Sequence, residues 1–175
     1  MVYNIAHIGC LPEMKGIELF NRLSCDKSIN AKWFVIGLLE IHEKQKLYDW
    51  SNVVSTGWFN GFNELKHYIE LFNIDLIVSF SMCPESFSYT LSEAWKLGLP
   101  VVGSSLGAIG NRIKKCNGGW IVDVYNYDDV KLTIKTILDN PLIFETKKRN
   151  INTIELKTLE DMKCEYNEIY RDIIG

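Results

Sequence analysis

Six short apolar runs, separated by segments with helical spacing, constrain the fold of this chain most strongly. The runs lie at residues 3–9, 32–37, 52–59, 75–80, 100–104 and 120–123. Each has the length and the Val, Ile and aromatic content of a strand that is buried on both faces. Parallel strands need crossover connections, which are usually helical, so the alternation predicts an α/β fold. We expect a doubly wound parallel sheet of about six strands with helices on both faces.

The connections between the runs show the apolar spacing of helices. Helices are expected at residues 17–23, 40–50, 62–72 and 87–95, then from Asp128 to Asn140 and over about 158–174. In the helix at residues 87–95 the expected apolar stripe consists of Phe87, Leu91, Ala94 and Trp95. These segments supply the layers that cover the predicted sheet.

Capping and turn residues mark where several of these segments begin and end. Asp128 is the expected N-cap of the fifth helix, and Asn140-Pro141 ends it. Thr158 and Asp161 resemble a capping box for the last helix. Residues 105–112 contain two glycines and are expected to form a loop whose backbone approaches a phosphate or a sugar hydroxyl.

Composition bounds the class of protein without naming a function. The 175 residues suit a single domain over residues 1–175, with no internal repeat or linker. A net charge of -3 gives no basic footprint for nucleic acid, so no nucleic-acid partner is expected. Five cysteines without a CxxC pair indicate neither a disulfide framework nor a zinc site, and they favour a reducing, cytoplasmic setting. No apolar stretch approaches the length of a membrane span.

Residues 79–103 carry the clearest chemical signal in the chain. They look like a strand end, a tight polar loop, an amphipathic helix and the start of the next strand. Glu85 and Glu93 flank a helix N-terminus that begins with hydroxyl residues, and such a terminus favours phosphate because its first amides are unpaired. The two glutamates are at most roughly 12 Å apart along a helix, so a diphosphate fits between them. The stretch therefore predicts a sugar-nucleotide site.

This stretch resembles a known family signature. The segment Glu85-Ser-Phe-Ser-Tyr-Thr-Leu-Ser-Glu93-Ala-Trp-Lys-Leu-Gly-Leu-Pro-Val-Val-Gly is similar to the paired-glutamate motif of family 4 (group 1) glycosyltransferases with the GT-B fold. Ser88 stands where that motif usually has glycine. The resemblance continues through Gly107-Ala-Ile-Gly110 and Gly118-Gly119-Trp120, and it extends back to the first loop. It implies a Rossmann-like sheet that forms the C-terminal, donor-binding half of a GT-B enzyme.

The resemblance also implies a reaction and the roles of several residues. Family members transfer a glycosyl group from a nucleotide-diphosphate sugar, with retention and without a metal ion, and the chain contains no Asp-x-Asp motif. Glu85 would contact the donor sugar and stabilise the positive charge that develops at its anomeric carbon. Glu93 would accept hydrogen bonds from the ribose hydroxyls. The donor diphosphate would be bound by Lys15 and by residues around the helix start, namely Ser86, Phe87, Ser88, Tyr89 and Thr90. No cofactor is implied besides the donor substrate.

Two other loops are expected to contribute to the donor site. The first loop commonly has an arginine directly after the strand glycine, but Cys10 occupies that position here, so the bidentate arginine contact with phosphate is lost. After the third run, Gly57 and Trp58 lie where relatives hold the nucleotide base. Trp58 can stack on a base, although an aromatic residue at a strand end is more often part of the core. Gly107 is the expected backbone contact from the fifth loop.

A GT-B enzyme has two such domains, and its acceptor site lies largely in the N-terminal one. The resemblance therefore implies that the N-terminal acceptor domain is the missing partner of this chain, which alone would bind a nucleotide sugar but hardly turn it over. Bacterial capsule or lipopolysaccharide biosynthesis is the expected pathway, with peripheral association of the full-length enzyme at the inner face of the membrane.

Several alternatives compete with this interpretation. A GT-B sugar-nucleotide epimerase and a non-catalytic nucleotide-binding module remain open. A dehydrogenase is disfavoured because residues 9–16 lack the Gly-x-Gly-x-x-Gly motif. A glycosidase is disfavoured because both glutamates belong to one loop-and-helix segment and flank a phosphate-type site. His7, within an apolar run, is expected to be a hydrogen-bonded core residue. The nucleotide, the sugar, the acceptor and the oligomeric state are not specified by the sequence.

Overall fold

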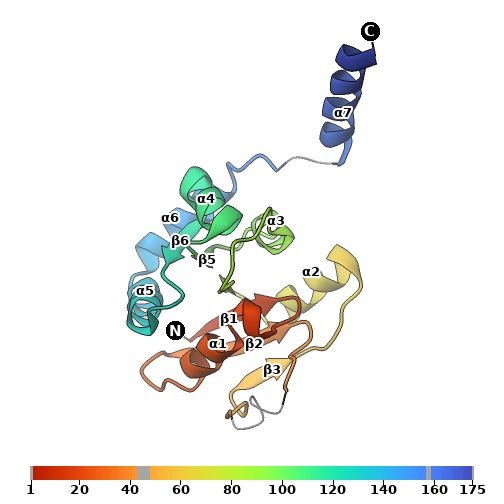
Figure 1. The fold of residues 1–175 in the computed structure, drawn as a ribbon. Coiled ribbons are helices and arrows are strands. Elements are labelled where there is room, and N and C mark those ends of the chain that lie inside the picture. Colours follow the sequence, from red (N-terminus) through yellow and green to blue (C-terminus); the bar gives the residue numbers. More distant parts are fainter. Residues whose placement is uncertain (1, 43–47, 157–158, 175) are drawn as a thin grey trace.

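The fold is a single open sheet of six parallel strands with helices around it (Figure 1). It is taken from a computed structural model that describes residues 2–42, 48–156 and 159–174. The strands are β1 (Tyr3–Ile8), β2 (Ala31–Ile36), β3 (Val53–Ser55), β4 (Leu76–Ser79), β5 (Val101–Ser104) and β6 (Gly119–Val122). Their order is β3-β2-β1-β4-β5-β6. The predicted α/β sheet is confirmed, and its order reverses between β1 and β4.

Helices follow the strands and cover both faces of the sheet. They are η1 (Glu13–Lys15), α1 (Ile17–Ser24), α2 (Gly61–Leu71), α3 (Tyr89–Lys96), α4 (Gly107–Cys116), α5 (Tyr127–Asp139), α6 (Pro141–Ile151) and α7 (Leu159–Ile174). Apolar residues of α1 and α5 pack in one core cluster, and those of α2, α3 and α4 pack in another. Neighbouring strand residues alternate between the clusters, as Ile5 and Ala6 do in β1. The sheet is therefore wound on both sides.

The pairing of β1 brings two distant loops together. β1 pairs with β2 along its whole length and with β4 at Ile5↔Leu76 and Ala6↔Ile77. Beyond the strand ends, the Met82 amide donates to the Met14 carbonyl at 2.9 Å. Open α/β sheets bind ligands in the crevice at such a reversal of strand order. The loops after β1 and β4 are thus placed where a ligand site is expected.

Two helices differ from the sequence-based expectation. The expected loop at 105–112 is wrong, because α4 begins at Gly107, and its Ile109 and Ile113 are buried. An additional helix, α6, begins at Pro141, whose missing amide is harmless at a first helical position. The Asn140 side chain accepts from the Ile143 amide at 3.4 Å, so Asn140-Pro141 both ends α5 and begins α6.

Three local assignments are also corrected. Asn126, not Asp128, caps α5, because its side-chain oxygen accepts from the amides of Asp128 and Asp129. β3 is only three residues long, so Gly57 and Trp58 lie beyond it. Phe87 precedes α3 and is 48% exposed, so it does not belong to the buried stripe of Leu91, Ala94 and Trp95.

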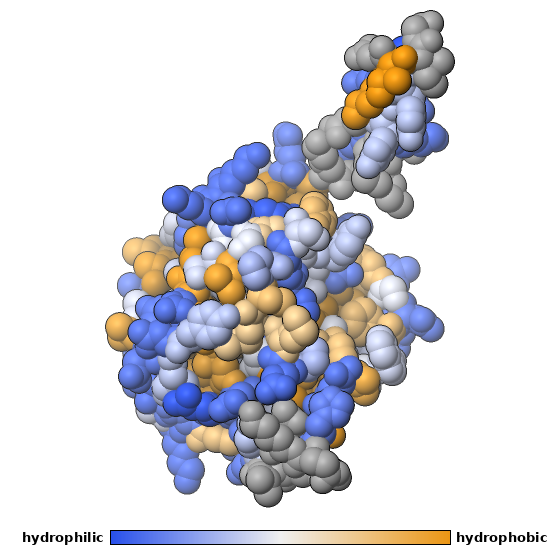
Figure 2. Space-filling view, in the orientation of Figure 1, coloured by the Kyte–Doolittle hydropathy of each residue, from blue (hydrophilic) through white to orange (hydrophobic). Residues whose placement is uncertain are grey.

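Two expected helices touch residues outside the described ranges. In the segment 40–50, residues 43–47 lie outside the described residues, and the flanking residues 40–42 and 48–50 are not helical. Thr158 lies outside them as well, so the capping box remains a prediction. The final helix is present as α7, which projects away from the sheet in Figure 1. Its Ile169 and Ile173 are exposed, and Figure 2 shows an uncovered apolar strip on this helix.

Candidate functional site

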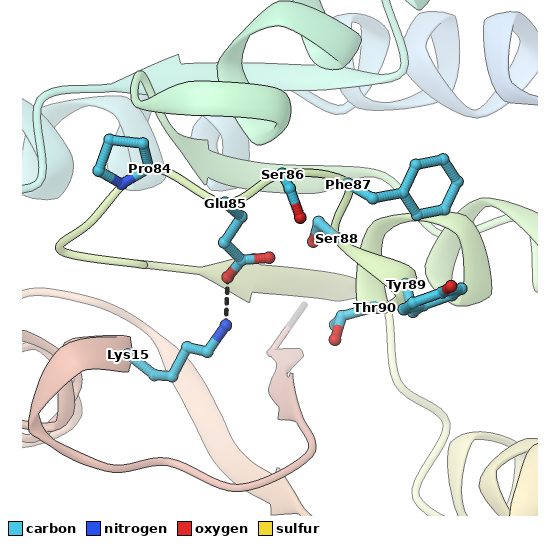
Figure 3. A pocket seen from close by; sticks show the side chains of 8 residues that line it. All are labelled: Lys15, Pro84, Glu85, Ser86, Phe87, Ser88, Tyr89 and Thr90. Carbon is cyan, nitrogen blue, oxygen red and sulfur yellow. Dashed lines mark hydrogen bonds and ion pairs between the residues drawn. The ribbon is translucent and has the colours of Figure 1, made fainter.

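A hollow of about 480 Å³ lies where the loops after β1 and β4 meet. It is lined by Lys15 and by the continuous segment Pro84, Glu85, Ser86, Phe87, Ser88, Tyr89 and Thr90 (Figure 3). Lys15 ends η1, and the segment connects β4 to α3. The structure therefore brings together Lys15 and six other residues that the sequence predicts to bind the donor.

An ion pair between Lys15 and Glu85 crosses this hollow (Figure 3). Burial raises the pKa of the Glu85 carboxyl, whereas the hydrogen bond and charge of Lys15 lower it. The nearby hydroxyls of Ser88 and Ser81 lower it further, so the pKa of Glu85 lies below its ordinary value. The Glu85 side chain is 17% exposed and that of Lys15 is 39% exposed. The site thus places an ionised carboxylate beside an accessible cation.

The N-terminus of α3 adds unpaired backbone donors to the hollow. The first four amides of a helix have no partner within it, and the N-cap residue Ser88 makes no side-chain capping hydrogen bond. Ser88 has a left-handed backbone, with φ 65° and ψ 87°. Its Oγ is buried and has no hydrogen-bond partner among the described residues. Helix amides, a free hydroxyl and Lys15 together favour an anionic ligand.

Arg112 holds this segment from behind, and its role is not apparent from the sequence. It donates to the carbonyls of Phe87 and Ser88 at 2.8 and 2.9 Å, and to Ser92 Oγ at 2.8 Å. Its guanidinium lies 4.4 Å from the centroid of the Phe87 ring and 5.3 Å from that of Trp95. Burial lowers the pKa of Arg112. The role of Arg112 cannot be read from the sequence around it, because its hydrogen-bond partners lie between β4 and β5, at least 20 residues earlier.

Gly107 supports the same segment through a close backbone approach. Its φ is +54°, and a Cβ atom there would lie 2.7 Å from both the amide nitrogen and the carbonyl oxygen of Glu85. The next residue, Ala108, donates its amide to the Glu85 carbonyl at 2.9 Å. Gly107 does not line the hollow, so its visible contact is with Glu85 and its direct ligand contact remains a prediction.

Glu93 lies on α3 outside the residues that line the hollow. It is half-buried, and burial raises the pKa of its carboxyl. Within the described part of the chain, burial alone shifts its pKa, and no hydrogen-bonding or charged partner contributes. A half-buried carboxylate without a partner is free to accept from ligand hydroxyls, and the ribose contact remains a prediction.

Gly57 and Trp58 lie after β3 and do not line the hollow. Gly57 has φ +75°, a conformation that favours glycine. Trp58 is 75% exposed, so the alternative that it belongs to the core is excluded. An indole with this exposure is available for stacking, and that role also remains a prediction.

The loop after β1 contains a neutral thiol in place of a cation. Cys10 Sγ donates to Glu40 Oε1 at 2.7 Å. Burial and then the Glu40 carboxylate raise the pKa of Cys10 to about 11. Burial lowers the pKa of His7 to about 4, and its Nε2 lies 3.1 Å from the Cys10 carbonyl oxygen. His7 is thus the hydrogen-bonded core residue that the sequence predicts, and Lys15 is the cation this loop presents to the hollow.

The described residues contain neither a metal-binding cluster nor a membrane-spanning helix. No group of three His, Cys, Asp or Glu side chains among them is arranged to hold a metal ion. None of the helices in the described ranges has both the length and the apolar character that crossing a bilayer requires.

Comparisons with solved structures find the same fold in longer glycosyltransferase chains. A glycosyltransferase from Rickettsia africae is 21% identical with a TM-score of 0.72, and the match covers 99% of this chain and 48% of that one. HepE from Anabaena, solved with UDP-glucose, is 18% identical with a TM-score of 0.66 and coverages of 86% and 43%. WaaG, described as involved in lipopolysaccharide biosynthesis, is 19% identical with a TM-score of 0.71 and coverages of 94% and 46%. The chain therefore spans about half the length of these proteins.

Comparison with curated protein sequences finds no match. The profile of one family, described as glycosyl transferases group 1, matches residues 3–155. This match includes both loops of the hollow and covers most of the chain. The chain therefore belongs to the group 1 glycosyltransferases.

Proposed function

We propose that this chain is the donor-binding half of a retaining, metal-independent glycosyltransferase that uses a nucleotide-diphosphate sugar. The observation that carries the proposal is the convergence of Lys15, Glu85 and the unpaired N-terminus of α3 on one hollow. Two phosphates need neutralising charge and amide donors, and a reacting sugar needs an adjacent carboxylate. The hollow offers both within one short segment and one facing lysine.

In this proposal the Lys15–Glu85 ion pair forms in the absence of ligand, and donor binding disrupts it. The diphosphate binds to Lys15 and to the amides of residues 87–90, and these groups stabilise the negative charge of the leaving group. Glu85 is then released to hydroxyls of the donor sugar and to the positive charge at its anomeric carbon. Glu93 accepts from the ribose hydroxyls, and Trp58 stacks on the base. No metal or organic cofactor takes part.

The partners and pathway follow from the same proposal. HepE was solved with UDP-glucose, which supports a nucleotide sugar as the ligand of this chain. The chain spans less than half of the Rickettsia enzyme, HepE and WaaG, which supports an N-terminal acceptor domain as its partner. WaaG supports polysaccharide or lipopolysaccharide biosynthesis as the pathway. All five cysteines are free, as suits a cytoplasmic enzyme, and we place its work at the inner face of a membrane.

A thermal-shift screen of the chain against UDP, GDP, ADP, CDP and TDP and their sugar conjugates, with and without magnesium, tests the proposal. A ligand at about a hundred times its Kd adds roughly 2.7 kcal/mol, which raises the Tm by about 5–10 °C for a domain of this size. We expect one nucleotide to produce this rise without magnesium. If none of the nucleotides or their sugar conjugates raises the Tm, donor binding is contradicted.

Glu93→Ala and Glu70→Ala form a matched pair for this screen. Glu70 lies on α2, is exposed and forms a helical ion pair with Lys66. We expect Glu93→Ala to abolish the rise because the ribose contact is lost, and Glu70→Ala to retain it. Equal responses of the two variants would exclude Glu93 from the site. Product analysis of the full-length protein separates a transferase, which moves the sugar to an acceptor, from an epimerase.

A further inference from the structure

The hydroxyl of Ser88 is a buried polar group that the fold leaves unused. Ser88 is 7% exposed, and its Oγ has no hydrogen-bond partner among the described residues. Leaving a buried hydroxyl without a partner costs stability, so such groups are uncommon in native proteins. Ser88 also lines the hollow (Figure 3). The hydroxyl lies near the Glu85 carboxylate and lowers the pKa of that group, so Glu85 is its nearest possible acceptor within the protein. The distance and angle between the two groups are nevertheless not those of a hydrogen bond.

The backbone of Ser88 accounts for the free hydroxyl. A serine at a helix N-cap normally has an extended backbone and accepts a hydrogen bond from an amide of the first turn. Ser88 instead has φ 65°, and its side chain makes no capping hydrogen bond to the α3 amides. A left-handed serine is strained, and Arg112 holds it there by donating to the carbonyls of Phe87 and Ser88. Ser88, which lines the hollow, therefore destabilises the fold in two ways, through an unpaired buried hydroxyl and through a strained backbone.

The surroundings of the hydroxyl indicate the chemistry of its partner. The α3 amides and the Lys15 ammonium both favour negative charge at this point. A serine hydroxyl can donate one hydrogen bond, and no described residue accepts it here. Glycine, the residue usual in the family motif at this position, offers only its amide.

We propose that Ser88 Oγ donates a hydrogen bond to a diphosphate oxygen of the bound donor, a contact that glycine cannot make. The proposal rests on the proposed function, because it names a further contact within the same donor site. It gives the α3 end of the site a side-chain donor in addition to its amides. This contact adds to the phosphate binding of a site whose facing loop has the neutral Cys10 thiol at the position of the usual arginine.

Calorimetric titration of the 175-residue chain and its Ser88→Ala and Ser88→Gly variants tests this contact. The ligands are inorganic pyrophosphate and UDP, GDP, ADP, CDP and TDP. Both variants should bind pyrophosphate and the preferred nucleotide about tenfold more weakly, because a hydrogen bond to a charged group is lost. The Tm of unliganded Ser88→Ala should be unchanged or higher, and that of Ser88→Gly higher, because a buried unpaired hydroxyl is removed and glycine also relieves the strain.

Ser24→Ala is the matched control. Ser24 is equally buried, but its Oγ donates to the Asn21 carbonyl at 2.9 Å within α1. Its removal should lower the Tm and leave ligand affinity unchanged, the opposite of the result expected for Ser88→Ala. A merely structural role of Ser88 would move its Tm in the same direction as that of Ser24→Ala.

Three outcomes overturn the proposal. If both Ser88 variants bind as tightly as the wild type, the hydroxyl is not a ligand contact, while donor binding itself stands. If the loss caused by Ser88→Ala disappears in a Glu85→Gln background, Ser88 acts through Glu85 and not on the diphosphate. If the wild-type chain binds neither pyrophosphate nor any of the five nucleotides, the proposed function fails together with this inference.

Discussion

The loops after β1 and β4 face the same hollow but contribute to it unequally. The β1 loop presents one accessible cation, Lys15, while Cys10 is held as a neutral thiol by Glu40. The segment after β4 presents a carboxylate, a free hydroxyl and the amides of a helix start, and Arg112 braces it. Most polar groups that face the hollow therefore come from one segment, and the other loop supplies the opposite charge. One loop of the hollow thus contributes a single cation, and the facing segment contributes the remaining polar groups and is held in place by Arg112.

Gly16→Ala and Gly107→Ala should distort the loops after β1 and β4, respectively. Among the variants considered, they should cause the largest loss of unfolding free energy. Gly16 has φ +81°, and a Cβ atom there would lie 2.6 Å from the Phe80 carbonyl oxygen. The equivalent atom at Gly107 would meet the Glu85 backbone at 2.7 Å. We expect each variant to lose about 2–3 kcal/mol of unfolding free energy in urea denaturation, and to lose nucleotide binding.

Gly98→Ala is the control for this pair. Gly98 has a similar φ of +73°, but a Cβ atom there would meet no other atom within 4 Å, so only backbone strain of about 1–2 kcal/mol is expected. Equal losses in all three variants would show that close approach between the loops is not what holds the hollow together.

Arg112→Gln should destabilise the segment after β4 and leave the loop after β1 unchanged. The change removes two hydrogen bonds to carbonyls and the contacts with the Phe87 and Trp95 rings. We expect a loss of about 1–2 kcal/mol in urea unfolding, together with weaker nucleotide binding in calorimetry. Arg22→Gln is the control, because Arg22 lies over the Tyr127 ring and does not line the hollow. Unchanged binding by Arg112→Gln would refute the bracing role.

Cys10→Arg should add a second cation to the loop after β1 and so increase its affinity for phosphate. An arginine there restores a donor suited to bidentate phosphate contact. We expect pyrophosphate affinity to rise about tenfold, equivalent to about 1.4 kcal/mol, as measured by calorimetry. Cys10→Ala, which removes the thiol without adding charge, should bind like the wild type. Equal affinities of the arginine and alanine variants would mean that position 10 does not reach the diphosphate.

Removing the Lys15–Glu85 ion pair by Glu85→Gln should have the smallest effect on stability, and the size of this effect should depend on pH. Folding lowers the pKa of Glu85, so the pair contributes stability above the unfolded pKa of about 4.3 and loses it as the pH falls through the lower folded value. We expect the wild type to exceed Glu85→Gln by less than about 1 kcal/mol at neutral pH, because Lys15 is 39% exposed. Urea unfolding of both proteins near neutrality and below the folded pKa measures this difference. A difference that grows on acidification would contradict the ion pair.

The features that the sequence predicts correctly are local ones. Apolar runs predict strands that are buried on both faces, and the sheet confirms them. The placement of Lys15 and Glu85 in one site is what the family resemblance implies, because periodicity alone does not predict contacts between loops. The features that it does not predict depend on tertiary contacts. Gly107, the first residue of α4, lies close to the Glu85 backbone, and the carbonyls that accept from Arg112 lie 24 and 25 residues earlier in the chain. The exposure of Trp58 likewise depends on how early β3 ends.

The position of the hollow between β1 and β4 also has a kinetic consequence. Lys15 and Glu85 are separated by 70 residues, and the chain forms α1, β2, β3, α2 and β4 between them. Contacts with such separation require the closure of a long loop, and they slow folding relative to local contacts. The amino-terminal half can therefore complete its own strand pairs before any ligand site exists. Ligand-induced protection during refolding would then report the docking of β4 onto β1, because the hollow needs the loops after both strands.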